Sequence, residues 1–231
     1  MTSSNDVVPP ETRPSQTRPL NTLWWNTNLP KHLQTPTCPA YLQYAFDNAK
    51  DRAVLSTPDA LYRRQTWPEV QELIRQNRLQ DFTRVPSELR AYREFCSDIE
   101  QGYGSILNFI LKERLRWELE SADADGRMSF DDAKATYRIL RNDWPYGFDP
   151  RIVHLVVWTK FALPIDPDSE IGDMSSAARK VVDDFVGKTF SEVSEKVWFK
   201  NWGALKSVHA VEHFHVLLFN PGEKLVERVT G

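Results

Sequence analysis

Two histidines stand two residues apart in the apolar segment AVEHFHVLLF, residues 210–219. If this segment forms a β-strand, alternate side chains share a face, so His213 and His215 point to the same side. An imidazole titrates near neutral pH and can accept a proton, attack as a nucleophile or bind a metal ion. The pair therefore indicates a catalytic cleft, a metal site or two hydrogen-bonded core histidines.

Two other segments with strand-like alternation carry similar side chains. A strand face that packs on helices is usually purely apolar, so the polar and aromatic faces should point away from the helices. Alignment of the three segments in one sheet then predicts an aromatic-walled cleft with a few polar groups. Besides the two histidines, these faces hold His154, Trp158 and Lys160 in residues 152–160, and Trp198, Lys200 and Trp202 in residues 196–202.

The elements that must position these groups divide the chain into a helical half and a strand-rich half. Apolar periodicity and N-cap residues such as Thr66 and Ser87 predict helices over residues 66–77, 86–100, 103–120 and 174–190. Alternating or apolar segments rich in β-branched and aromatic residues predict strands over residues 135–143, 152–160, 196–202 and 209–219. This order predicts an α+β fold, in which a helical N-terminal half packs on an antiparallel sheet.

The composition limits the domain organisation. Residues 1–40 are rich in Pro, Thr, Ser and Asn, so we expect a mostly disordered or extended tail, with the Leu-Trp-Trp at 23–25 as an aromatic anchor. The remainder, residues 41–225, suits one α+β catalytic domain. A net charge of −3 argues against a generally basic nucleic-acid binder but permits a local basic patch.

The cysteines and the hydropathy pattern indicate the compartment. Cys38 and Cys96 show no zinc-type spacing, and the chain contains neither a signal-peptide pattern nor a long apolar segment. We therefore expect a cytoplasmic protein without a membrane span. We also expect no bound metal, since the histidine pair has no acidic or cysteine ligand at obvious spacing. The segment SADADGRMSFDD, residues 121–132, resembles a calcium loop but departs from it at the first and last ligand positions.

Four segments together resemble a known fungal family. WPEVQELIRQNRLQDFTRVPSELRAY, YGSILNFILKERLRW, ILRNDWPYGFDPRIVHLVVWTKF and VEHFHVLL are similar to the N-acetylglucosamine-induced proteins, a family with a domain of unknown function. The resemblance covers roughly residues 60–220. The fungal arginine-containing cyclodipeptide synthases, which condense two aminoacyl-tRNAs, resemble the same family. The resemblance implies an aminoacyltransferase of secondary metabolism, with arginyl-tRNA and a second charged tRNA as partners.

Cyclodipeptide formation needs a base for an α-ammonium proton and a donor for the tetrahedral oxyanion. Under this resemblance the catalytic candidates are His154, His213, His215, Lys160 and Tyr146. An arginine side chain would be held by a carboxylate, Asp143 or Glu212. The other substrate-binding candidates are Trp144, Trp158, Trp198, Lys200 and Trp202. The esters are already activated and no Gly-rich phosphate loop is evident, so we expect no cofactor.

Other interpretations stay open. The segment RNDWPYGFDPRIVHLVVWTK and the later VEHFHVLL are similar in pattern to the histidine-triad fold, which implies a nucleotide or sugar-nucleotide hydrolase or transferase. Val211 stands where the first histidine of a full triad would be. A non-enzymatic small-ligand sensor would use the same aromatic face. For tRNA, a phosphate-binding stripe is predicted from Arg90, Arg93, Lys112, Arg114 and Arg116.

Overall fold

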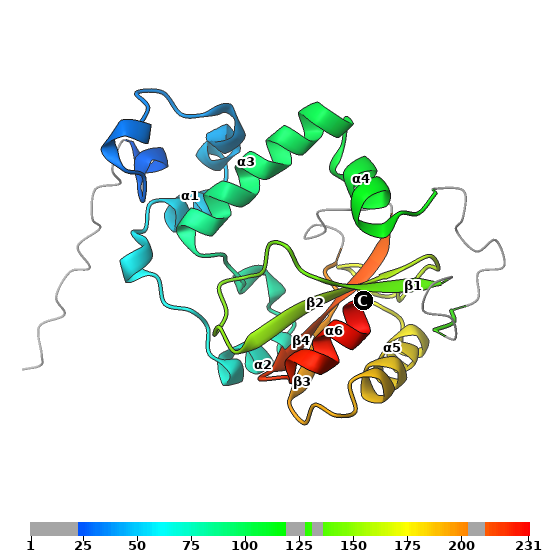
Figure 1. Cartoon of the computed structure of the whole chain (residues 1–231). Coiled ribbons are helices and arrows are strands. Elements are labelled where there is room, and N and C mark those ends of the chain that lie inside the picture. The colour runs from blue at the N-terminus through cyan, green and yellow to red at the C-terminus, as the bar shows by residue number, and fades with distance from the viewer. Residues whose placement is uncertain (1–22, 119–127, 131–135, 203–210) are drawn as a thin grey trace, which may run out of the picture.

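A four-stranded sheet lies between two layers of helices (Figure 1). The computed structural model describes residues 23–118, 128–130, 136–202 and 211–231. The strands are β1 (Tyr137–Arg141), β2 (Ile152–Thr159), β3 (Lys196–Phe199) and β4 (Glu212–Phe219). Their order in the sheet is β1-β2-β4-β3 and all neighbours are antiparallel. The α+β class predicted from the sequence is therefore confirmed.

The register of the sheet decides which side chains share a face. His154 of β2 lies opposite Leu217 of β4, and Trp158 lies opposite His213. Directly opposed residues of antiparallel strands point to the same side, so all three histidines lie on one face of the sheet. The sequence prediction of a shared histidine face is confirmed.

The opposite face of the sheet is apolar and packs on α5 (Ser176–Thr189) and α6 (Glu223–Thr230). Ser175 caps α5 by accepting a hydrogen bond from the backbone N–H of Ala178, as its position before an apolar stripe predicts. Helix α6 was not foreseen from the sequence. The largest fully buried members of this core are Leu155, Val157, Val182, Phe190, Phe214, Val216, Leu218 and Val226.

The histidine face is covered by the N-terminal half rather than by solvent. Its helices are α1 (Ala49–Leu55), α2 (Trp67–Arg75), α3 (Pro86–Tyr103) and α4 (Ile106–Phe109), followed by a π-helix over Ile110–Leu115. Short 3₁₀-helices connect them at Trp24–Asn26, Lys31–Leu33, Ala40–Phe46, Asp59–Leu61 and Leu79–Asp81. In Figure 1, α1, α3 and α4 lie on one side of the sheet, and α5 and α6 lie on the other. Any cleft at the histidines must therefore lie between sheet and helices.

The helix boundaries follow local chemistry, with two corrections to the sequence predictions. Thr66 forms the expected capping box with Glu69 at the start of α2. However, α3 begins at Pro86 after Val85, so Ser87 is not its N-cap. The helix expected over residues 103–120 instead starts at Ile106 and ends at Leu115, as α4 followed by the π-helix. Gly104 adopts φ 77°, which ends α3, and α4 starts directly after it.

Residues 23–46 pack on the helices rather than extending from them. Trp24 and Trp25 are buried in a cluster with Leu42, Leu55 and Leu89, as expected of an aromatic anchor. The first 22 residues of the predicted tail lie outside the described residues. Across the described ranges, no helix is long and apolar enough to span a bilayer.

Candidate functional site

The three histidines of the shared face are buried and in mutual contact. The Nε2 atom of His154 lies 2.9 Å from Nδ1 of His215, a hydrogen-bond distance, and the rings of His213 and His215 lie 5.6 Å apart. Asn142 Nδ2 lies 3.2 Å from His154 Nε2, and Asn201 Nδ2 lies 3.3 Å from His215 Nε2. Each ring of the histidine dyad therefore has an asparagine amide within hydrogen-bond distance.

Burial keeps this dyad neutral. It lowers the pKa of His154 to about 3, with a smaller contribution from the Arg84 guanidinium. Burial also lowers the pKa of His215 well below its ordinary value, and the neighbouring His154, His213 and Arg84 act in the same direction. These two imidazoles do not titrate near neutral pH. Burial therefore argues against His154 or His215 as the near-neutral base expected from the sequence.

His213 has a different environment. Its Nδ1 lies 2.9 Å from the carbonyl oxygen of Val211. A carbonyl oxygen can only accept, so Nδ1 carries the proton and Nε2 is the basic nitrogen of the neutral ring. The ring lies against Trp158, with centroids 4.5 Å apart. The backbone thus fixes the tautomer that a proton acceptor or a nucleophile needs at Nε2.

A cavity of about 120 Å³ lies between the histidine face and the helical layer. His213, His215 and Trp158 contribute from the sheet, while Phe95 of α3 and Phe109 of α4 contribute from the helices. An engineered apolar cavity of roughly 150 Å³ accepts benzene, so this space suits one side chain or one ring. The remaining lining residues that matter here are Arg84, Tyr92, Arg114, Asn142, Asp143, Trp144, Tyr146 and Asn201.

Two polar atoms of the cavity wall are buried without a hydrogen-bond partner among the described residues. They are the indole Nε1 of Trp144 and the amide oxygen Oδ1 of Asn201. A buried donor or acceptor normally has a partner, because leaving it without one costs about 1–3 kcal/mol. Trp144 and Asn201 both line the cavity, so these two atoms are candidates for contact with a bound molecule.

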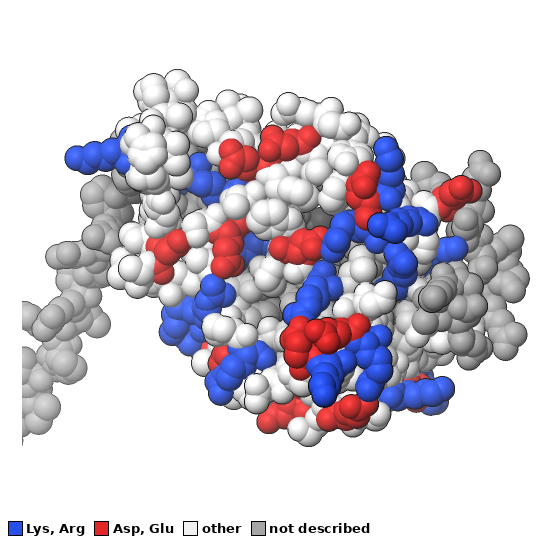
Figure 2. All heavy atoms as spheres, in the orientation of Figure 1, with Lys and Arg blue, Asp and Glu red and all other residues white. Residues whose placement is uncertain are grey.

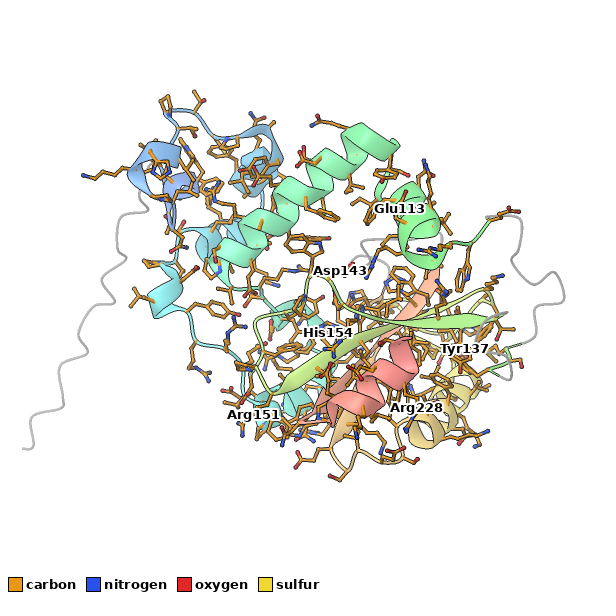
Figure 3. The ribbon with its side chains drawn as sticks, viewed as in Figure 1. Glu113, Tyr137, Asp143, Arg151, His154 and Arg228 are labelled. Atoms are coloured by element: carbon orange, nitrogen blue, oxygen red, sulfur yellow. The ribbon has the colours of Figure 1, made fainter. Side chains whose placement is uncertain are left out.

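The loop between β1 and β2 brings the acidic group to the cavity. Asp143 accepts a hydrogen bond from the guanidinium of Arg114 at 2.7 Å, and both side chains are partly exposed. In Figure 3, Asp143 lies between the sheet and the helical layer that carries Glu113. Tyr146, from the same loop, stacks on His154 with ring centroids 5.7 Å apart. Asp143, Trp144 and Tyr146 thus line the same cavity as His213 and His215.

Gly147 is required for the loop to reach this position. A Cβ there would meet the hydroxyl of Tyr62 at 2.1 Å, far inside van der Waals contact. The backbone N–H of Gly147 donates to the carbonyl of Thr83, and its own carbonyl accepts from Gln65. The loop is therefore fastened to the segment that immediately precedes Arg84.

Arg84 is a site residue that the sequence did not reveal. Its guanidinium lies 4.1 Å from the ring centre of Tyr92 and 5.1 Å from that of Tyr146. Its Nε donates to the carbonyl of Trp144. No carboxylate of the described residues forms an ion pair with it. Arg84 stands in a loop, where no periodicity points to it, and only tertiary packing brings it to the cavity.

The orientation of strand β3 differs from the one expected from the sequence. Phe199, not Trp198, shares the histidine face, because Phe199 lies opposite His215 in the register. Trp198 points to the other side and donates through Nε1 to Asp183 of α5. Trp202 packs on the cluster around Trp67 and Phe82. Neither tryptophan lines the cavity.

Two lysines and Glu212 are also placed away from the cavity. Lys200 forms a buried ion pair with Glu212 at 2.7 Å and lies 3.4 Å from the carbonyl of Leu163. Glu212 has the parity of the α5 face, opposite to the histidines. Lys160 shares the histidine parity, but its ammonium lies over the Trp117 ring at 5.3 Å. None of the three lines the cavity.

The predicted basic stripe is divided. Arg90 is only 8% exposed and donates to the hydroxyl of Tyr41, while Arg93 lies over the ring of Tyr44 at 3.8 Å. Their inward position contradicts a continuous surface stripe. Lys112 and Arg116 are exposed, and Arg114 lines the cavity. Figure 2 shows basic side chains gathered over the π-helix and β1, on the face where α3 carries acidic ones.

A metal site receives no support from the part of the chain described here. Among those residues, no group of three or more His, Cys, Asp or Glu side chains is placed to hold an ion. Most of the calcium-like segment 121–132 lies outside the described ranges.

Comparisons with known proteins identify the family and relatives to which the chain is similar. Residues 66–219 match the family described as "Protein of unknown function (DUF3605)". The chain is 31% identical over 182 residues to N-acetylglucosamine-induced protein 1 of Candida albicans, covering 71% of this chain and 72% of the relative. It is 30% identical over 165 residues to the uncharacterized protein YPL067C of Saccharomyces cerevisiae, covering 68% and 80%.

A solved structure, titled "Crystal Structure of HTC1", is similar as well. It superposes with a TM-score of 0.59 at 27% identity and covers 72% of this chain and 95% of that one. The family match spans most of the sequence and includes the sheet, the β1–β2 loop and all three site histidines. The chain therefore belongs to the DUF3605 family, together with the N-acetylglucosamine-induced protein of Candida albicans.

Proposed function

We propose that this protein is an aminoacyl-tRNA-dependent synthase of an arginine-containing cyclic dipeptide. One observation carries the proposal: a single cavity holds a histidine with a fixed basic nitrogen and a carboxylate that already binds a guanidinium. The histidine is His213, and the carboxylate is Asp143, which accepts from Arg114 at 2.7 Å. The resemblance to cyclodipeptide synthases supplies the reaction, and the cavity supplies groups that suit it.

In the proposed reaction, the neutral α-amine of one aminoacyl group attacks the ester carbonyl carbon of the other. A peptide C–N bond forms, the ester C–O bond breaks, and the first tRNA leaves through its ribose oxygen. His213 Nε2 accepts the proton that the amine loses and returns it to the leaving oxygen. The remaining amine then attacks the second ester, which closes the six-membered ring and releases the second tRNA.

Three neighbouring groups suit different parts of this reaction. The indole N–H of Trp144 is buried without a partner among the described residues and can donate to the tetrahedral oxyanion. Asp143 is suited to an arginine side chain, which would replace Arg114 as its partner. The buried His154–His215 dyad lies beside His213, with the rings of His213 and His215 5.6 Å apart.

The exposed basic side chains beside the cavity support a polyanionic partner. Lys112 and Arg116 are exposed next to Arg114, which itself lines the cavity. Phosphates of a tRNA acceptor stem on this surface would direct the charged end to the cavity, and such binding weakens with salt. This patch replaces the longer stripe predicted from the sequence.

The fixed tautomer of His213 also favours a second candidate, a histidine-triad-like nucleotide hydrolase or transferase. In that reaction Nε2 attacks a phosphorus atom instead of accepting a proton. Val211 offers only its backbone carbonyl to His213 where a full triad has another imidazole. The cavity also lies next to an acidic residue, Asp143, which repels a phosphate. For these two reasons we rank the hydrolase below the synthase as a candidate function.

A reconstituted reaction tests the proposal. The purified chain is supplied with tRNA, the twenty amino acids, ATP and aminoacyl-tRNA synthetases, and cyclic dipeptides are measured by mass spectrometry. We expect a cyclic product that contains arginine and disappears after ribonuclease treatment. Nucleotide cleavage without a dipeptide would favour the hydrolase. Binding of a small ligand without any turnover would favour the non-enzymatic sensor.

A further inference from the structure

A second and larger cavity adjoins the histidine cavity. Its volume is about 580 Å³, within the range of about 300–1,000 Å³ that is usual for ligand pockets. Residues of α1 and α3 and the segment Leu79–Arg84 line it. Arg84, Tyr92, Ile106 and Tyr146 line both cavities, so these four side chains form the junction between them.

Arg84 is held at this junction with most of its hydrogen-bond donors unused. The rings of Tyr92 and Tyr146 both contact its guanidinium, and Trp144 accepts from Nε. A guanidinium has five N–H donors, so the four on the terminal nitrogens have no protein acceptor among the described residues. Their fork geometry matches two oxygens of a phosphate or carboxylate.

The rest of the larger cavity is also suited to an anion. Lys50 and Arg93 line it with Arg84, and the opposing carboxylates are Asp51 and Glu100. Asp51 is engaged, because it accepts from the hydroxyl of Tyr44 at 2.7 Å. The Nε of Arg93 is buried without a partner among the described residues. Three cations against two carboxylates leave an excess of one positive charge in the cavity.

We infer that the larger cavity binds the 3′-terminal nucleotide of the charged tRNA, with Arg84 as the anchor for its phosphate. The inference rests on the proposed function. The smaller cavity has room for one side chain, so the aminoacyl group would enter it while the ribose and phosphate stay in the larger one. The ester would then lie at the junction, within reach of the histidine cavity.

Binding of adenosine 5′-monophosphate to the full chain tests this assignment without any turnover. Calorimetric titration should show that this nucleotide binds at least about tenfold tighter than adenosine, which lacks the phosphate. Inorganic phosphate should compete, and the preference should shrink as salt is raised. Equal binding of the nucleotide and the nucleoside, or no binding of either, would overturn the inference.

Substitutions locate the phosphate. Arg84→Gln should weaken binding of the monophosphate at least about tenfold and leave adenosine binding unchanged. The affinity of Arg84→Lys for the monophosphate should lie between those of the wild type and Arg84→Gln, since lysine keeps the charge but lacks the forked pair of donors. Arg75→Gln, on the exposed face of α2, is the matched control and should bind like the unsubstituted chain. Wild-type affinity in a folded Arg84→Gln variant would contradict the anchor.

The result can be separated from the proposed function. If the monophosphate binds through Arg84 but no cyclic dipeptide forms from charged tRNA, the nucleotide site stands and the synthase proposal fails. If the dipeptide forms and Arg84→Gln changes neither nucleotide affinity nor the KM for charged tRNA, the synthase proposal stands and the anchor fails. A melting curve for each variant excludes misfolding, and the comparison of nucleotide with nucleoside needs no variant.

Discussion

His154 and His215 share a hydrogen bond of 2.9 Å across two neighbouring strands, and both rings are buried. One ring nitrogen donates and the other accepts, so the accepting ring carries no proton at that nitrogen. A proton added there would place a donor against a donor. The dyad therefore joins β2 to β4 through side chains only while the accepting ring stays neutral.

This arrangement predicts a loss of stability in acid. Both histidines have a folded-state pKa below the unfolded value of 6.5, so the unfolded chain binds more protons. Their contribution is complete above pH 6.5 and falls by about 1.4 kcal/mol per pH unit for each histidine below it. For His154 the loss continues to its folded pKa of about 3.

Urea unfolding at pH 7, 6 and 5 measures this effect. His154→Gln removes one titrating group. As the pH is lowered, the unfolding free energy of this variant should therefore fall less steeply than that of the wild type. His32→Gln, at an exposed position, should keep the wild-type slope. Parallel curves for the wild type and His154→Gln would contradict the neutral dyad.

Asp143 is expected to select arginine without holding the fold together. Its ion pair with Arg114 is partly exposed, and such pairs stabilise proteins by about 0–1 kcal/mol. Asp143→Asn should therefore melt near the wild-type temperature. It should lower arginine incorporation about 10- to 100-fold, which corresponds to the free energy of a hydrogen bond to a charged group. Asp184→Asn on α5 is the control. Unchanged arginine incorporation in Asp143→Asn would remove the residue from recognition.

Lys200 and Glu212 should behave as a structural pair. Their side chains are 6% and 18% exposed, and removal of one partner leaves a charge in a buried site. Lys200→Met should destabilise the fold by about 3–5 kcal/mol, and the double variant Lys200→Met/Glu212→Leu should recover part of that loss. Chemical denaturation of both variants gives the two values. A stable Lys200→Met protein with lost turnover would instead support a catalytic lysine.

Gly147 should not tolerate a methyl group. An alanine there overlaps the Tyr62 hydroxyl, and crowding of this kind typically costs about 1–3 kcal/mol. Gly147→Ala should therefore lower the melting temperature. Adding Tyr62→Leu should reduce the penalty, because it removes the group that clashes. If adding Tyr62→Leu does not raise the melting temperature of the Gly147→Ala protein, the overlap with the Tyr62 hydroxyl is not the cause of the lost stability.

The strands were predictable where one face has a distinct composition. In β2 and β4, His154, His213 and His215 alternate with mainly apolar residues, Glu212 being the exception beside His213, so the pattern indicates which side each faces. β3 offered no such distinction, because Val197 and Phe199 are as apolar as Trp198. Its orientation is set by pairing with β4, a tertiary fact that residue spacing does not encode.

The helical half limited the sequence prediction in another way. The sequence predicted that Arg90 and Arg93 are surface charges, yet tyrosines of the Ala40–Phe46 segment cover both. The break after α3 did have a signal, since Gly104 followed by Ser105 combines a left-handed cap with an N-cap. Arg84 had none, because its role depends on two cavities that exist only in the folded chain.

The most direct measurement is the initial rate of cyclic dipeptide release from charged tRNA by the wild type, His213→Ala and His32→Ala, each confirmed as folded by its melting curve. His213 Nε2 is the proposed proton acceptor, so His213→Ala should be slower by about 10²–10⁴, while His32→Ala should match the wild type. A folded His213→Ala protein that releases arginine-containing cyclic dipeptide at the wild-type rate would contradict the central claim.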